Sequence, residues 1–121
     1  MPALEITAEQ APKDLDVFLK NLSKVFSECI GKPESHCLVT FTKVDRVYFA
    51  GSSGAAFLAK ITSIGNIDNE RNAQLVSKVG GELEKELGIS LDRGYFFFSD
   101  AKAADIGFKG TTFENIFKGR A

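Results

Sequence analysis

The chain has 121 residues, and its 15 Lys and Arg against 16 Asp and Glu give a formal net charge of −1. This length suits one domain with a single core, and the balanced charge gives no electrostatic footprint for nucleic acid or an anionic membrane. Two cysteines and one histidine are too few for a metal site, and no apolar run approaches the roughly 20 residues of a membrane-spanning helix, so we expect no metal, no nucleic-acid partner and no membrane insertion.

The first half of the chain predicts a strand, a helix and a second strand. Residues 2–7 alternate, with Leu4 and Ile6 on one face, which is typical of a strand covered on one side. From about Asp14 to Ile30 apolar residues recur at helical spacing, and Gly31 is a typical helix end. Residues 35–43 alternate again and predict the second strand, while Cys29 and Cys37 are expected to be reduced, buried thiols.

The second half predicts the same order of elements. A strand is expected over 57–64, a helix that Asp68 caps, and a strand over 94–99. The expected apolar stripe of this helix is Ala73, Val76, Val79, Leu83 and Leu87. Two glycines, Gly80 and Gly81, cost the helix about 1 kcal/mol each relative to alanine, so we expect something to pack closely there. The tail predicts a short strand around 111–113 and a polar, partly aromatic extension over 114–121.

These elements form a repeat, because a shift of 57 residues lays Ile30-Gly31 on Leu87-Gly88. The predicted fold is α/β of the α+β kind: two pseudo-symmetric β-α-β units in one domain over 1–121, forming a four-stranded mixed sheet with two antiparallel helices on one face. The run 95–98 is aromatic at every position, so both faces of that strand need cover. Since the helices cover only one face, we infer an oligomer.

Pro2 is the first candidate functional residue. Methionine before a small residue is normally removed, so we expect the mature chain to begin at Pro2 with a free secondary amine. A chance proline is the alternative, because proline makes up about 5% of residues on average.

Several blocks in a fixed order give this proline more weight. They are Pro2, Ile30-Gly31-Lys32-Pro33-Glu34-Ser35, Phe49-Ala50-Gly51-Ser52-Ser53, Ser63-Ile64-Gly65, Asp92-Arg93-Gly94-Tyr95 and Ile106-Gly107-Phe108-Lys109-Gly110-Thr111-Thr112-Phe113. Together they resemble the macrophage migration inhibitory factor family, which includes D-dopachrome tautomerase. The resemblance covers residues 2–113 and implies a homotrimer with an active site at each subunit interface. It also implies keto-enol tautomerisation of phenylpyruvate-like 2-oxo acids and conversion of dopachrome-type substrates.

By this resemblance Pro2 is the catalytic base, no cofactor is needed, and the substrate-binding residues are Lys32, Ile64, Tyr95, Phe97, Ile106, Phe108 and Phe113. Moving a proton from carbon needs a base of near-neutral pKa, and burial and the Lys32 cation would both lower the pKa of the proline amine. The Lys32 ammonium and the backbone N–H of Ile64 would hold the substrate carboxylate. The alternative for Lys32 is a solvated lysine that favours the helix C-terminus.

The pocket walls implied by the family come from two chains. Ile106, Phe108 and Phe113 would belong to one chain, and Tyr95 and Phe97 to its neighbour. Ordinary interface packing is the alternative for Phe97, which stands where the mammalian factor has an asparagine, so hydroxyphenylpyruvate is expected to be a poorer substrate than phenylpyruvate.

Two further positions depart from the family pattern. Ala56 and Ala59 replace the Cys-x-x-Cys pair of the mammalian factor, so thiol-disulfide exchange is not predicted. His36 replaces a tyrosine near the pocket mouth, and an exposed strand histidine is favoured over a role in orienting substrate.

Three functions stay open on the sequence. The first is the tautomerase, the second a signalling ligand with a vestigial pocket and a cell-surface receptor as partner, and the third a decarboxylating tautomerase of the D-dopachrome type. No basic segment followed by an apolar one marks a secretory signal, so the expected location is cytoplasmic, and secretion in a cytokine role would have to bypass a signal peptide.

Overall fold

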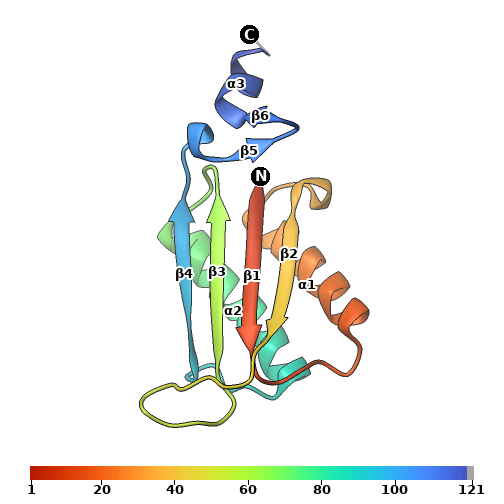
Figure 1. The fold of residues 1–121 in the computed structure, drawn as a ribbon, viewed down its shortest axis with the longest axis vertical. Coiled ribbons are helices and arrows are strands. Elements are labelled where there is room, and N and C mark those ends of the chain that lie inside the picture. Colours follow the sequence, from red (N-terminus) through yellow and green to blue (C-terminus); the bar gives the residue numbers. More distant parts are fainter. Residues whose placement is uncertain (120–121) are drawn as a thin grey trace.

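The computed structural model describes residues 1–119 as a four-stranded mixed sheet with two helices packed on one face (Figure 1). The sheet order is β2-β1-β3-β4, with β1 parallel to β2, antiparallel to β3, and β3 parallel to β4. These strands and the two long helices are β1 (Pro2–Ala8), α1 (Leu15–Ile30), β2 (Leu38–Lys43), β3 (Phe57–Ser63), α2 (Asn69–Leu87) and β4 (Gly94–Asp100). The expected pair of β-α-β units in a mixed sheet is confirmed.

Helix α1 begins and ends as the sequence predicts. The Asp14 side chain accepts a hydrogen bond from the Val17 N–H at 3.1 Å, and Gly31 ends the helix in the left-handed conformation with φ 73°. The apolar stripe points at the sheet, where its buried members are Phe18, Leu22, Phe26 and Ile30. Together with residues of β1, β3 and α2 they form the single hydrophobic core.

Helix α2 buries the predicted stripe in its second half, at Val79, Leu83 and Leu87, but not at its start. Its buried residues are Leu75, Val79, Gly80, Leu83 and Leu87, whereas Ala73 is exposed and Val76 is 38% exposed. Leu75 and Val76 lie four and three residues before Val79, so helical spacing allows either, and the larger side chain faces the core.

The expected close contact at the paired glycines is confirmed at one of them. A Cβ on Gly80 would lie 2.7 Å from Leu91 Cδ2, whereas one on Gly81 would meet nothing within 4 Å.

The second strand is shorter than predicted at its start. Residues 35–37 leave the strand because a 3₁₀ turn, Glu34–His36, follows Pro33, and the N–H of His36 donates to the Pro33 carbonyl at 2.9 Å. His36 is therefore an exposed turn residue and not a strand residue. Strand β2 itself alternates as expected, with Val39 and Phe41 packed against the core and Leu38 exposed.

The segment after Asp100 stands beyond the end of the sheet, beside the N-terminus (Figure 1). It contains a 3₁₀ turn, a two-stranded hairpin and a short helix: Ala103–Asp105, β5 (Gly107–Phe108), β6 (Thr111–Thr112) and α3 (Phe113–Lys118). Lys109 and Gly110 both have positive φ, which is the geometry of a two-residue hairpin turn. The expected strand is thus confirmed as β6, but α3 replaces part of the expected polar tail, whose residues 120–121 lie outside the described part.

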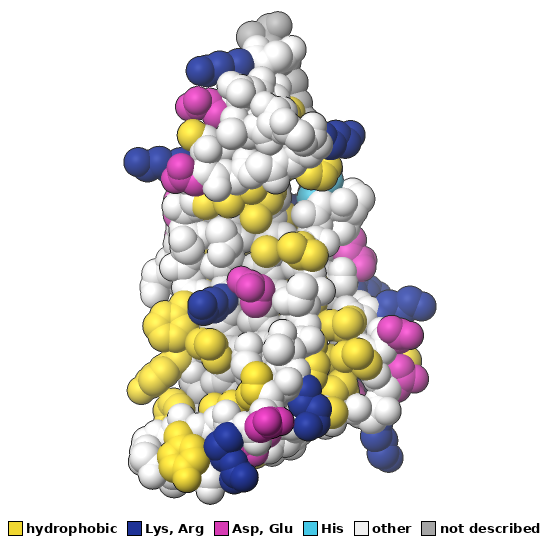
Figure 2. Space-filling model, in the orientation of Figure 1, with side chains coloured by type: hydrophobic (Ala, Val, Ile, Leu, Met, Phe, Trp, Pro, Cys, Tyr) yellow, Lys and Arg dark blue, Asp and Glu magenta, His cyan; other side chains and the backbone are white. Residues whose placement is uncertain are grey.

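One face of the sheet has no helix over it. Tyr95 and Phe97 are 64% and 55% exposed on this face, while Phe96 and Phe98 point the other way into the core. Figure 2 looks onto this side and shows hydrophobic side chains in several groups between charged ones.

Cys29 and Cys37 are free thiols but only half-buried, less than expected. Within residues 1–119 no helix is long and apolar enough to cross a membrane.

Candidate functional site

Pro2 lies fully buried at the first position of β1, opposite Ser63 of β3. Met1 precedes it, so in this form the Pro2 nitrogen is an amide without a lone pair for a proton. The Met1 carbonyl accepts a hydrogen bond from the backbone N–H of Ile64 at 3.4 Å. This N–H is the group expected to hold a substrate carboxylate, and here the chain's own first residue occupies it.

Lys32 reaches the same end of the sheet from the end of α1. It follows the left-handed Gly31, and the Ser27 hydroxyl donates to the Lys32 carbonyl at 2.6 Å, which fixes the backbone there. Its side chain is half-buried, and Nζ donates to the Ile64 carbonyl at 2.6 Å. The lysine is therefore held beside the N-terminal residues of β1 and not extended into solvent.

Two groups near Lys32 have shifted pKa values. Burial lowers the pKa of the Met1 amino group below its ordinary value near 8.0, and the Lys32 ammonium lowers it further, against a smaller opposite effect of Cys37. Burial raises the pKa of the Cys37 thiol, and the Glu34 carboxylate raises it further. Cys37 is thus a protonated thiol at neutral pH and a poor nucleophile.

These residues form the floor of a cavity of about 780 Å³. Its lining combines the N-terminus, the turn before β2 and the C-terminal segment: Met1, Pro2, Lys32, Ser35, His36, Cys37, Leu38, Ile106, Gly107, Phe108, Lys109, Thr111, Phe113, Ile116 and Phe117. Five of the eight residues predicted for the site, Pro2, Lys32, Ile106, Phe108 and Phe113, line it. No carboxylate side chain is in this lining, so the cavity is apolar with cationic groups.

The other three predicted residues do not line the cavity of the single chain. Ile64 lies at its edge through its hydrogen bonds to Met1 and Lys32. Tyr95 and Phe97 lie on the uncovered face of β4, where their ring centroids are 6.3 Å apart. Their place in a neighbouring chain's pocket stays a prediction.

Sequence reasoning missed several lining residues. Ile116 and Phe117 come from α3, where a polar, partly aromatic tail was expected that would either cover the pocket rim or extend the neighbour's sheet edge. Lys109 comes from the turn between β5 and β6. His36 also lines the cavity, although an exposed strand histidine was favoured. The i, i+3, i+4 spacing of Phe113, Ile116 and Phe117 was the available signal for a helical face.

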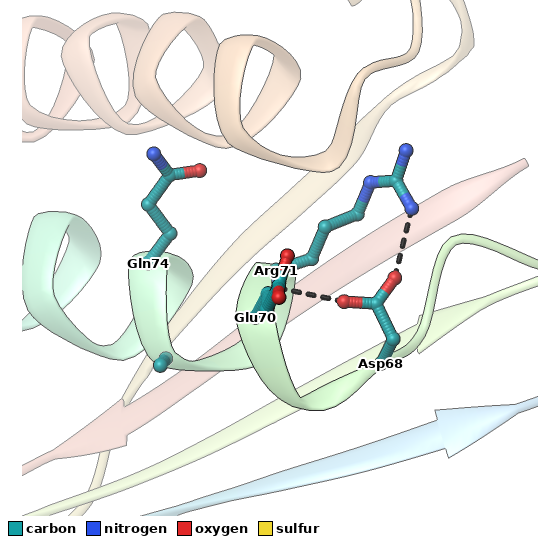
Figure 3. A pocket seen from close by; sticks show the side chains of 5 residues that line it. Asp68, Glu70, Arg71 and Gln74 are labelled. Carbon is teal, nitrogen blue, oxygen red and sulfur yellow. Dashed lines mark hydrogen bonds and ion pairs between the residues drawn. The ribbon is translucent and has the colours of Figure 1, made fainter.

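A second hollow of about 580 Å³ lies at the start of α2 (Figure 3). Two of its polar residues pair with each other, since Asp68 accepts from the Arg71 N–H and pairs with the Arg71 guanidinium, both at 2.8 Å. The backbone hydrogen bond from Arg71 is the main cause that lowers the pKa of Asp68. This hollow is a helix cap and not a second catalytic centre.

Within residues 1–119, no group of three or more His, Cys, Asp or Glu could hold a metal ion.

Comparison with known proteins gives one consistent result. The family model described as macrophage migration inhibitory factor matches residues 1–114. A macrophage migration inhibitory factor homolog of Trichuris trichiura is 31% identical over 114 residues, which are 93% of this chain and 100% of that protein. One of Trichinella spiralis is 33% identical over 108 residues, 89% of this chain and 92% of that protein.

The fold agrees as well. The solved structure of a macrophage migration inhibitory factor homologue from Prochlorococcus marinus matches with a TM-score of 0.87 and 31% identity, over 92% of this chain and 98% of that one. The chain belongs to the macrophage migration inhibitory factor family, within the tautomerase superfamily.

Proposed function

We propose that the protein is a keto-enol tautomerase of phenylpyruvate-like 2-oxo acids and dopachrome-type substrates, with Pro2 as general base after Met1 is removed. The observation that carries this proposal is the position of Pro2, at the floor of an apolar cavity that Lys32 borders and no carboxylate lines. Family membership supports the same reaction.

Removal of Met1 changes two groups at once. The Pro2 nitrogen becomes a secondary amine that can accept a proton, and the Ile64 N–H loses its bond to the Met1 carbonyl. The first supplies the base, and the second supplies a donor for the substrate. Both groups then lie at the same end of the sheet, where β1 begins and β3 ends.

The base must be unprotonated to work near neutral pH. A secondary amine is intrinsically more basic than a primary one, but the burial and the Lys32 charge that lower the pKa of the Met1 amine act at the same place. In the neutral form the Pro2 nitrogen takes the proton from the carbon next to the keto group. It then gives the proton to the enolate oxygen, so no cofactor is consumed.

Lys32 has the role of positioning and stabilising charge. Its ammonium can bind the substrate carboxylate together with the freed Ile64 N–H, which turns the acidic carbon toward Pro2. The same cation stabilises the negative charge that develops on the enolate oxygen.

The complete site is proposed to need a neighbouring chain in a homotrimer. Tyr95 and Phe97 are exposed on the uncovered sheet face and absent from the cavity of their own chain. In an assembly through this face they would close the pocket of the next chain.

The test replaces Pro2 by glycine and follows phenylpyruvate tautomerisation in protein whose first residue is verified by mass spectrometry. Pro2→Gly is expected to reduce kcat/KM by about 10²-fold or more, because a positioned base contributes 10²–10⁴-fold. A preparation that retains Met1 should be inactive as well. Pro12→Gly, a loop proline outside the cavity, is the matched control and should keep wild-type activity. Full activity of either Pro2→Gly or the Met1-bearing form contradicts the proposal.

Product analysis separates the two tautomerase types. With a dopachrome substrate, a simple tautomerase retains the carboxylate, whereas a decarboxylating one releases carbon dioxide. We expect retention of the carboxylate in this protein.

A further inference from the structure

The cavity wall extends past the part of the chain that matches the family. That match ends at residue 114, but Ile116 and Phe117 line the cavity from α3. Helix α3, which carries them, lies on the far side of the β5–β6 hairpin from the N-terminal end of β1 (Figure 1). These two side chains are therefore a feature of this chain's pocket that the family pattern does not supply.

Helix α3 is held in place by its own polar contacts. Thr112 accepts from the Asn115 N–H at 3.2 Å, and the Asn115 amide donates to the Thr111 hydroxyl at 3.1 Å. The Phe113 N–H donates to the Ile106 carbonyl at 3.0 Å, which ties the start of the helix to the segment before β5. The positions of Ile116 and Phe117 are thus set by the hairpin that also carries Phe108.

Three aromatic rings follow one another along this wall. Phe108 and Phe113 are stacked, with centroids 5.5 Å apart and planes 2° apart, and Phe113 and Phe117 are 5.6 Å apart at 41°. These separations are the ones at which aromatic rings attract each other, so a further ring from a ligand can join the row.

The charges around the wall favour an anion. Lys109 Nζ lies 5.4 Å from the centre of the Phe108 ring, and Lys32 is at the Pro2 end of the cavity. Among residues 1–119 the lining has two lysines and no carboxylate side chain, so the cavity attracts a negatively charged molecule that also has an apolar part.

We propose that Ile116 and Phe117 of α3 determine specificity by binding the aryl end of the substrate, so that the pocket selects aryl 2-oxo acids over short aliphatic ones. This rests on the proposed tautomerase function for the reaction, but the binding of the aryl group follows from the wall itself. The substrate carboxylate then lies toward Lys32 and the aryl ring toward Phe113 and Phe117.

The test compares Phe117→Ala and Ile116→Ala with wild type on phenylpyruvate and on 2-oxobutanoate, a short aliphatic substrate. Loss of one ring or side-chain contact should lower kcat/KM for phenylpyruvate about three- to tenfold, mainly through KM. The value for 2-oxobutanoate should change less than twofold. Phe117→Leu keeps an apolar side chain and should recover part of the loss. Val17→Ala, which shortens an exposed side chain of α1 outside the cavity, is the control for Ile116→Ala.

A binding measurement keeps this inference separate from the reaction. 3-Phenylpropionate has the aryl and carboxylate groups but no keto group, so its dissociation constant from NMR titration does not depend on catalysis. Weaker binding to Phe117→Ala and not to Val17→Ala supports the wall even if wild type proves inactive, in which case only the proposed function fails.

Other outcomes overturn the inference. If wild type is active and the α3 variants keep its kinetics on both substrates, the wall has no role while the tautomerase stands. An equal loss of kcat/KM on both substrates contradicts the proposed selectivity for aryl substrates. If the wild type has no activity and does not bind 3-phenylpropionate, both proposals are refuted. Thermal unfolding of each variant shows that it is folded.

Discussion

Lys32 is one of two causes that lower the pKa of the terminal amine, and the smaller one, after burial. On the Met1-bearing chain, Lys32→Gln should therefore raise this pKa while leaving it below the ordinary value near 8.0. An NMR titration of the selectively ¹³C-methylated terminus measures it. Lys24→Gln, which removes an exposed charge from α1, should leave the pKa unchanged, and an unchanged pKa in Lys32→Gln would contradict the assignment.

The lowered pKa of the terminal amine also makes the free energy of unfolding depend on pH. Because the amine binds its proton less well in the folded chain than in the unfolded one, the unfolded state gains protons first as pH falls. The contribution of this group to the free energy of unfolding is therefore present above the unfolded pKa and is lost as pH falls through the lowered, folded pKa. Lys32→Gln should make this loss smaller.

For single residues, the identity of the site residues was easier to predict than the hydrogen bonds that they make. Pro2 and Lys32 could be predicted because the resemblance to the family assigns them, and both line the cavity. The bond from Lys32 to the Ile64 carbonyl could not be predicted, since it depends on how the end of α1 lies against the loop after β3. The role of each residue in catalysis stays a prediction.

The paired glycines of α2 give a prediction at the level of the element. Gly81→Ala should raise the free energy of unfolding by up to about 1 kcal/mol, because a methyl group there meets nothing within 4 Å and alanine favours the helix. Gly80→Ala should gain less or lose stability, because its methyl group would lie 2.7 Å from Leu91 Cδ2, which must move. Urea unfolding of both variants tests the contrast, and an equal gain in both would contradict it.

The long helices and strands were predictable because caps and periodicity agree. In α1 the Asp14 cap, the apolar stripe and Gly31 all indicate the same bounds. Helix α3 was missed because it is only six residues long, and its cap depends on the side chain of Thr112 after a tight hairpin turn. Short elements of this kind are decided by contacts with neighbouring segments, which local pattern does not contain.

At the scale of the molecule, the uncovered sheet face predicts assembly. We expect sedimentation equilibrium to give three times the 13.2 kDa chain mass. Phe97→Glu places a charge on this face and should dissociate the assembly and lower tautomerase activity, because a buried unpaired charge is costly. Val17→Glu, on an exposed position of α1, is the control and should sediment as wild type. A wild-type protein of monomer mass would refute the assembly.

The two ends of the described chain border one cavity, with Met1 on one side and α3 on the other. An affinity tag fused directly before Pro2 would acylate its nitrogen, and a tag inserted directly after α3 would lie within a few residues of Phe117. A purification strategy that leaves both of these segments without a tag, or a scar-free protease release that exposes Pro2, is therefore required for a test of the proposed tautomerase activity.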